Sequence, residues 1–218
     1  MKSTTQNIKA IRLQFGDLTI TAEVEARLEE LGFTPETLIN AIGEHKSDCS
    51  GNPSIYCGTY GKYSGEKGIC GLWIDLSTFY DYDDFLNFCY AIHADERDPE
   101  LMYQDFENMP DSLYHESMGE KEFNKIEEYC ELCDDYSVEA VDDFLEWYSP
   151  EDLDMMHDSY AGVYDSEEDF AREIVNGCCD LEKMMGDLSY YFNYEALARD
   201  LFLGDYHFGS HGTVLRRL

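Results

Sequence analysis

Hydrophobic and polar residues follow two different periods along this chain, and the changes of period mark its expected elements. Alternating positions around Gly16-Asp17 predict a β-hairpin, and apolar positions three or four residues apart predict the helices after it. A polar stretch that contains glycine, residues 47–53, follows as a predicted linker. The expected elements before it are strands over 8–15 and 18–22, a helix over 22–31 that ends at Gly32, and a helix that opens at Thr34-Pro35-Glu36.

After the linker, segments with the period of a strand and segments with the period of a helix follow one another, which predicts an α+β fold. Residues 61–68 are expected to be a long hairpin loop, and residues 119–157 to be helical in three pieces, broken at Ser137 and at Ser149-Pro150. The other expected elements are strands over 54–60, 69–76, 101–106 and 160–164, helices over 82–94, from 165 onward and over 193–203, and a hairpin of 205–208 with 213–216.

Charge is the property in which this chain departs furthest from an ordinary domain. Its 218 residues include 47 Asp and Glu against 15 Lys and Arg, a net charge of −32. Residues 75–200 hold 37 of the acidic and 6 of the basic residues, whereas residues 1–74 are nearly balanced. Such a chain repels nucleic acids and anionic membrane surfaces, which excludes direct binding to either and favours a basic partner.

Three ordinary explanations fit this acidic block of residues 75–200 poorly. Solubility requires a net charge of only about 2–8 for a small domain. Adaptation to high salt would make residues 1–74 acidic as well. A disordered acidic tail does not need the Tyr, Phe, Leu and Trp residues that are interleaved with these acids. A solvated acidic surface that binds nothing stays the simplest alternative.

The spacing of the acids predicts where they point. Residues 122–148 are expected to form two helices, each with a stripe of apolar residues that faces the core. Most acids lie outside these stripes, so the outer faces of the two helices are expected to be rows of carboxylates. Like charges at this spacing cost about 0.2–0.5 kcal/mol per pair, and in the second of these helices no lysine is interleaved to offset that cost. The predicted stripes are Phe123, Ile126, Cys130 and Cys133 in the first helix and Val138, Val141, Leu145 and Tyr148 in the second.

Duplex DNA presents about one negative charge per 1.7 Å of its axis. The 31 excess negative charges of the acidic block therefore match about 50 Å of duplex, or about 15 base pairs, if the block is elongated. This match motivates the hypothesis that the acidic face replaces a phosphate backbone in the DNA-binding groove of another protein.

Neither the phosphate-binding motif nor the calcium-binding motif has the required residues at the required positions in this sequence. Gly61-Lys62 is followed by Tyr63 rather than by Ser or Thr, so the glycines around it do not form a phosphate-binding loop. Asp81 begins a pattern like that of an EF-hand, but Leu86 stands where glycine is needed and Ile92 where a glutamate is needed. We expect no cofactor and no dedicated calcium site.

Cysteine and histidine offer no positive signal for an enzyme. The eight cysteines follow no disulfide framework, and without an apolar export signal we expect reduced thiols. Cys130 and Cys133 have zinc-knuckle spacing, but the adjacent pair Cys178-Cys179 suits one tetrahedral site poorly, so core packing is favoured. A zinc module or metal-dependent enzyme that uses Cys130, Cys133 and a histidine stays an alternative.

Several segments, in order and from about residue 54 to the end, resemble the ArdA-type antirestriction proteins. Residues 1–52 lie outside this resemblance. The segments that carry it are Ser54-Ile55-Tyr56-Cys57-Gly58-Thr59-Tyr60-Gly61-Lys62-Tyr63, Gly71-Leu72-Trp73-Ile74-Asp75-Leu76, Phe79-Tyr80-Asp81-Tyr82-Asp83-Asp84-Phe85, residues 98–107, residues 114–117, Tyr164-Asp165-Ser166-Glu167-Glu168-Asp169-Phe170-Ala171 and residues 194–206.

The resemblance implies properties that composition does not show. Proteins of this family are carried on mobile genetic elements and act in the bacterial cytoplasm. They are elongated homodimers that mimic bent B-form DNA and block type I restriction-modification enzymes without catalysis. The resemblance and the element pattern together predict an elongated chain of small modules: an N-terminal extension over 1–52, an antiparallel sheet with one helix over 53–113, a helical module over 114–158 and an α+β module over 159–218.

The expected partner is therefore the DNA-binding groove of a type I restriction-modification enzyme. The alternative is a generic acidic binder or chaperone of basic DNA-binding proteins. The dimer contact is open; Tyr190-Tyr191-Phe192 is one candidate, although burial in the core is favoured for it. The acids expected to bind the partner are Asp105, Glu107, Asp111, Glu116, Glu122, Glu127, Glu128, Glu131, Asp134, Asp135, Glu139, Asp142, Asp143, Glu146, Asp165, Glu167, Glu168 and Asp169.

Overall fold

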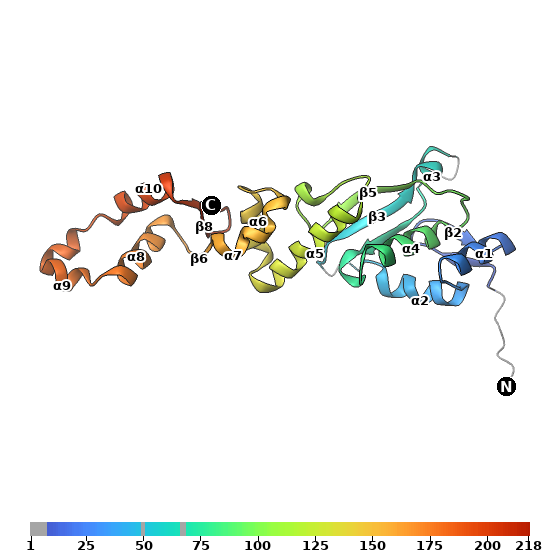
Figure 1. Ribbon diagram of the computed structural model, residues 1–218, viewed down its shortest axis with the longest axis horizontal. Coiled ribbons are helices and arrows are strands. Elements are labelled where there is room, and N and C mark those ends of the chain that lie inside the picture. The colour runs from blue at the N-terminus through green and yellow to red at the C-terminus, as the bar shows by residue number, and fades with distance from the viewer. Residues whose placement is uncertain (1–7, 49–50, 66–68) are drawn as a thin grey trace, which may run out of the picture. The chain divides into compact units, whose positions relative to one another are not determined.

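The computed structural model describes residues 8–48, 51–65 and 69–218. It confirms the α+β class, since small antiparallel sheets are combined with helices (Figure 1). Contacts divide the chain into two compact units, Met1–Glu127 and Glu128–Leu218, and the division falls within helix α5 (Glu120–Asp135). The four module boundaries expected from the sequence stay a prediction.

A three-stranded antiparallel sheet with the order β4-β3-β5 organises the first unit. Its strands are β3 (Ser54–Thr59), β4 (Leu72–Asp75) and β5 (Leu101–Glu107), which confirms the three strands expected there. All six positions of β3 are buried, as its central place in the sheet requires. Tyr56 lies opposite Trp73 on one side and Asp105 on the other, with a bulge between Tyr56 and Cys57.

Helix α4 (Tyr82–Ile92) packs on one face of this sheet. Asp81 caps it by accepting a hydrogen bond from the Asp84 backbone N–H at 2.9 Å. Its predicted apolar face, Phe85, Phe88, Cys89 and Ile92, is fully buried. Short 3₁₀ turns η1 (Leu76–Thr78) and η2 (Asp111–Leu113) flank the strands, and a short helix α3 (Tyr60–Ser64) begins the segment expected to be a hairpin loop.

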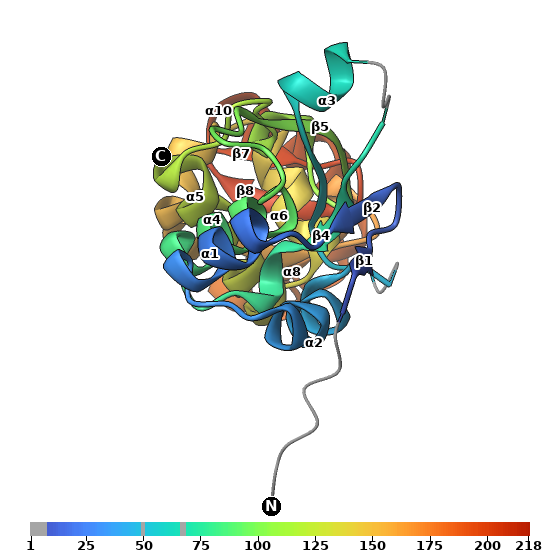
Figure 2. The same cartoon turned by 90° about the vertical axis from the view of Figure 1, so that its right-hand side faces the viewer.

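The N-terminal extension has the elements that its sequence predicts. The hairpin consists of β1 (Ala10–Arg12) and β2 (Asp17–Thr19), followed by α1 (Ala22–Glu30) and α2 (Pro35–His45). The threonine side chains that precede the two helices cap them. Leu28 and Leu38 are fully buried, and the imidazole of His45 stacks on Phe79 with ring centroids 4.1 Å apart. Figure 2 shows β1 and β2 beside β4.

The second unit contains a second antiparallel sheet, with the order β6-β8-β7. Its strands, β6 (Tyr160–Val163), β7 (Tyr206–Phe208) and β8 (Thr213–Arg216), agree with the expected strand and final hairpin. Phe170 connects the helices to this sheet, because its ring contacts those of Phe202 and Tyr206. The helices and 3₁₀ turns are α6 (Val138–Leu145), η3 (Pro150–Met155), α7 (Met156–Ser159), α8 (Glu167–Cys178), α9 (Leu181–Met185), η4 (Gly186–Tyr191) and α10 (Tyr194–Gly204).

Candidate functional site

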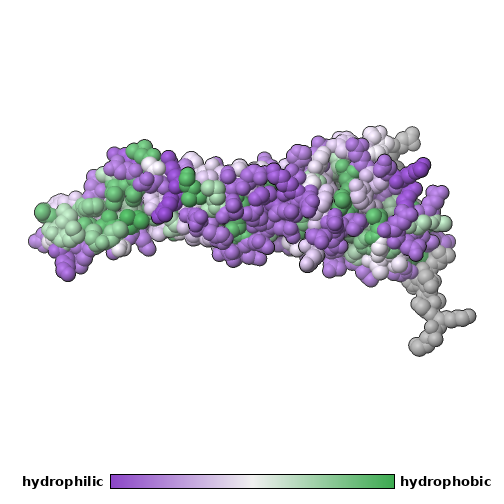
Figure 3. Space-filling view, viewed as in Figure 1, coloured by the Kyte–Doolittle hydropathy of each residue, from purple (hydrophilic) through white to green (hydrophobic). Residues whose placement is uncertain are grey.

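The most unusual chemical feature of the second unit is a run of residues with one sign of charge. From Ile126 to Ala171 the sequence has no Lys or Arg, while acidic residues recur throughout. In Figure 3 the surface over α5 and α6 is mostly hydrophilic, whereas hydrophobic residues gather over α9 and α10. The acids of this run are the candidate functional groups.

The buried side of α5 differs in part from the expected stripe. Phe123 and Ile126 are buried as predicted, but the next buried positions are Tyr129 and Leu132. Cys130 and Cys133 are only half-buried, so their placement on the core stripe was wrong. The Tyr129 ring offers more apolar area than a thiol, and its hydroxyl donates a hydrogen bond to Asp142 Oδ1 at 2.9 Å.

The α5 acids of the second unit lie away from the buried side. Glu131, Asp134 and Asp135 are exposed, and Glu128 is half-buried. Glu131 stands three residues from Asp134 and four from Asp135, which places the three carboxylates on one face of the helix. This face is the densest part of the predicted set.

Helix α6 has a different arrangement from the one expected. Its buried residues are Ala140, Val141, Asp143 and Phe144, whereas Val138 is 48% exposed. Glu139 and Glu146 are exposed as predicted, and Asp142 is half-buried. Burial raises the pKa of the Asp142 carboxyl above its usual value, against the effect of the Tyr129 hydroxyl that donates to it.

Asp143 corrects the prediction most clearly, because it is fully buried rather than part of the outer face. Its carboxylate accepts hydrogen bonds from the backbone N–H of His211 at 2.9 Å and of Thr213 at 3.1 Å, and from His211 Nδ1 at 2.9 Å. A Cβ on Gly209 would come within 2.3 Å of the Asp143 Cγ, so glycine is required there. Asp143 therefore fastens the β7–β8 turn to α6 and cannot contact a partner.

Glu146 also reaches this turn, but from the surface. Its carboxylate accepts a hydrogen bond from the Ser210 hydroxyl.

The pKa values of Asp143 and His211 reflect their contact. Hydrogen bonds from Thr213 and His211 outweigh the effect of burial on Asp143, so the pKa of that carboxyl lies below its usual value. The bond to Asp143 raises the pKa of His211. The turn is thus held by one buried and one exposed carboxylate.

The acids at the start of α8 have local partners. Ser166 caps the helix and also donates its hydroxyl proton to Asp169, and Arg172 pairs with Glu168 one turn along. Asp165, Glu167 and Asp169 are exposed, and Glu168 is half-buried. Acids in this first turn interact favourably with the helix dipole, which gives them a structural role beside any binding role.

The predicted acids of the first unit are spread over several elements. Asp105 and Glu107 lie exposed on β5, and Asp111 is exposed in η2. Glu116 is exposed and accepts a hydrogen bond from the Tyr60 hydroxyl at 3.0 Å.

Two further acids of this unit, Glu122 and Glu127, are half-buried on α5. Backbone hydrogen bonds, from its own N–H and from that of Gly119, lower the pKa of Glu122. Asp105, Glu107 and Asp111 lie on other elements, so the largest group of the predicted acids lies on α5 and α6.

An apolar segment, residues 181–192, is exposed, although sequence reasoning favoured burial for its last three residues. Tyr190 and Tyr191 are 81% and 84% exposed, so the expectation that they are buried in the core was wrong. Met184 and Leu188 are exposed as well. The signal in the sequence is Gly186, which ends α9 with a φ of 56°. Because this glycine interrupts the segment, its apolar residues cannot form one helix long enough to bury an apolar face.

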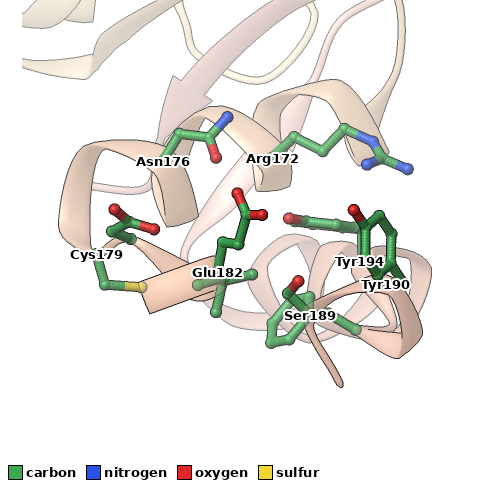
Figure 4. A pocket seen from close by; sticks show the side chains of 10 residues that line it. Arg172, Asn176, Cys179, Glu182, Ser189, Tyr190 and Tyr194 are labelled. Carbon is green, nitrogen blue, oxygen red and sulfur yellow. The ribbon is translucent and has the colours of Figure 1, made fainter. Parts of the chain in front are cut away.

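A hollow of about 670 Å³ lies between α8, this segment and α10. Figure 4 shows Arg172 and Asn176 of α8 on one side of it, with Glu182 and Ser189 opposite. The Arg172 guanidinium lies 4.2 Å from the ring centroid of Tyr194 and pairs with Glu168. Its charge is thus already partnered inside the chain.

Possible metal ligands do not gather into one site in the part of the chain that the structure describes. No group of three His, Cys, Asp or Glu residues there could hold a metal ion. Among the cysteines described, Cys57, Cys89, Cys133, Cys178 and Cys179 are free thiols. None of the helices in the described ranges is long and apolar enough to cross a membrane.

Comparison with known protein families identifies a match. A family model described as "Antirestriction protein (ArdA)" matches residues 55–215, about three quarters of the chain. A search of the curated proteins found no match. The matched region includes nearly all of the two three-stranded sheets, helices α3 to α10 and every acid of the predicted set. The extension, with the β1-β2 hairpin, α1 and α2, lies outside it.

Proposed function

Since the chain belongs to the ArdA family of antirestriction proteins, we propose that it inhibits type I restriction-modification enzymes by occupying their DNA-binding groove as a mimic of B-form DNA. The observation that supports this proposal is the set of exposed carboxylates on α5 and α6, Glu131, Asp134, Asp135 and Glu139, in a stretch without Lys or Arg. We define these four residues as the α5–α6 acidic face.

The energetic source of binding would be the one that drives DNA binding. A basic groove that binds DNA releases the counterions condensed on the phosphates. Carboxylates held on rigid helices offer the same release without the conformational cost that a flexible acidic chain would incur on binding. Inhibition is therefore stoichiometric and non-covalent in this proposal. It takes place in the cytoplasm of a bacterial host, where the protein is encoded by a mobile genetic element.

A cleavage assay tests the proposal. A purified type I restriction enzyme would receive unmodified plasmid and ATP while the protein is titrated in. We expect inhibition near one dimer per enzyme that weakens steeply as salt rises, since binding through about 6–10 charge contacts loses about 10³–10⁵ in affinity between 50 and 200 mM salt.

Polyglutamate of equal total charge is the control for that assay, because it has the carboxylates without the rigid arrangement. If polyglutamate inhibits equally well, the generic acidic binder replaces the DNA mimic. Absence of inhibition by the protein would contradict the proposal directly.

We also propose that the protein is a homodimer that pairs through the exposed apolar segment 181–192. This segment carries only Glu182, Lys183 and Asp187 as charged residues, so it is nearly neutral inside a strongly acidic unit. A second copy can approach there with little charge repulsion, whereas a basic groove would gain little from it. Two exposed tyrosines also suit the buried centre of an interface.

Replacing Tyr190 and Tyr191 by Asp is expected to give a monomer, because each change puts a charge at the centre of the proposed interface. Light scattering coupled to size-exclusion chromatography would measure the mass. Tyr80→Asp is the matched control, since Tyr80 is 89% exposed in the other unit. A double variant with the mass of the unaltered protein would exclude this segment as the dimer contact.

A further inference from the structure

Strand β4 is an edge strand of the first sheet, and edge strands present unpaired backbone groups to other chains. Leu72 and Ile74 pair with β3 on the inner side. The backbone groups of Gly71 and Trp73 point outward, to the side where no further strand of this sheet lies in the described chain.

The N-terminal extension supplies partners for each of these outward groups. Phe15 and Gly71 exchange two backbone hydrogen bonds, with N···O distances of 3.2 and 3.0 Å. The Trp73 carbonyl accepts from the backbone N–H of Ser47 at 3.0 Å. The Trp73 N–H donates to the side-chain oxygen of Gln14 at 3.3 Å. Two separate points of the extension, before α1 and after α2, thus cover the β4 edge.

Further contacts hold the extension in place. Leu28 of α1 and Leu38 of α2 are fully buried. The Arg27 guanidinium donates to the carbonyl oxygens of Ala94 and Glu96, at 2.8 Å each. His45 Nδ1 lies 2.9 Å from the Thr78 hydroxyl. These contacts involve the segments before and after α4, so both helices of the extension are anchored.

We infer that residues 8–48 are a built-in cap for the β4 edge, which keeps this sheet from pairing with the same edge of a second copy. The family match begins at residue 55, so the cap is added to the region that defines the family. It has hydrogen bonds for each outward group of Gly71 and Trp73, and an open edge at these positions would be a template for strand addition. This role is separate from the proposed inhibition.

The test is Leu38→Asp in the full chain. A carboxylate at this fully buried position has no partner, so the extension as a whole should lose its packing on the first unit. Gln14 and Phe15, which accept from the Trp73 and Gly71 amides, should then leave the β4 edge together with α2. We expect the amides of Gly71 and Trp73 to exchange with deuterium at least about tenfold faster, while the Phe123 amide of α5 keeps its protection. Light scattering at high salt, which screens the net charge, should then show assemblies larger than those of the unaltered protein.

Ile39→Asp is the matched control, because the neighbouring Ile39 is 43% exposed on the same helix. It should change neither exchange nor mass. The inference is overturned if Leu38→Asp leaves the Gly71 and Trp73 amides protected. It is equally overturned if these amides exchange fast and no association follows at any concentration.

If the Phe123 amide also loses protection, the first unit has unfolded and Arg27→Ala replaces the first variant. It removes the two bonds to the Ala94 and Glu96 carbonyls without burying a charge. Arg12→Ala is its control, since the Arg12 side chain is 79% exposed. The same two measurements and the same two contrary outcomes apply.

Discussion

Reversal of the α5–α6 acidic face, with Glu131, Asp134, Asp135 and Glu139 all changed to Lys, is expected to weaken inhibition of a type I restriction enzyme by roughly a hundredfold. Like charges brought together at an interface cost several kcal/mol, and about 1.4 kcal/mol corresponds to a factor of ten. The measurement is the concentration for half-inhibition in the plasmid cleavage assay. A single change such as Glu139→Gln should have little effect, because binding is distributed over many charges.

The matched control reverses four glutamates of α1, which lies outside the family match. Glu23, Glu25, Glu29 and Glu30 are all exposed, and their reversal changes the net charge of the chain by the same amount. The control variant should inhibit much more strongly than the α5–α6 variant, provided that circular dichroism shows both folded. Equal loss in the two variants would mean that net charge, and not the placement of the carboxylates, determines inhibition.

Asp143→Ala is expected to destabilise the second unit by about 3 kcal/mol. The change leaves the buried Thr213 N–H without its acceptor and releases the His211 backbone and ring, and a buried donor without a partner costs about 1–3 kcal/mol. Urea unfolding followed by circular dichroism would measure it. Asp134→Ala is the control, because Asp134 is exposed on α5, and it should change the free energy of unfolding by less than about 0.5 kcal/mol.

The pH dependence of this anchor has a definite sign. The pKa of Asp143 lies below the usual aspartate value of 3.8, so its stabilisation is present above that pH and is lost as the pH falls through the lowered pKa. The pKa of His211 lies above the usual histidine value of 6.5, so its stabilisation is present below that pH and is lost as the pH rises through the raised pKa. The stability difference between the unaltered protein and Asp143→Ala should therefore be largest between about pH 4 and 6.5. A difference independent of pH would contradict the ion pair.

Most of the local structure followed from the sequence, because it depends on neighbouring residues. Thr34-Pro35-Glu36 predicted the start of α2, and the side chain of Thr34 does accept a hydrogen bond from the Thr37 N–H. The stripe of Phe85, Phe88, Cys89 and Ile92 predicted the buried face of α4. The family resemblance also followed from the residues, and the family match over residues 55–215 confirms it.

The candidate site followed only in part, since exposure depends on residues far away in the chain. Asp142 and Asp143 are adjacent acids on one helix, and no local rule separates them. The β7–β8 turn, about 70 residues later, covers Asp143 and leaves its neighbour half-exposed. The same reason explains Tyr190 and Tyr191, whose apolar character predicts burial although no element packs over them within the described chain.

By itself, then, the sequence determined the elements, the α+β class, the family and the concentration of negative charge, because these are properties of short segments and of composition. Tertiary structure decided which carboxylates face solvent, which apolar residues stay exposed, and that the extension lies along the edge of β4. These features depend on contacts between segments such as Phe15 and Gly71, which only the folded chain brings together.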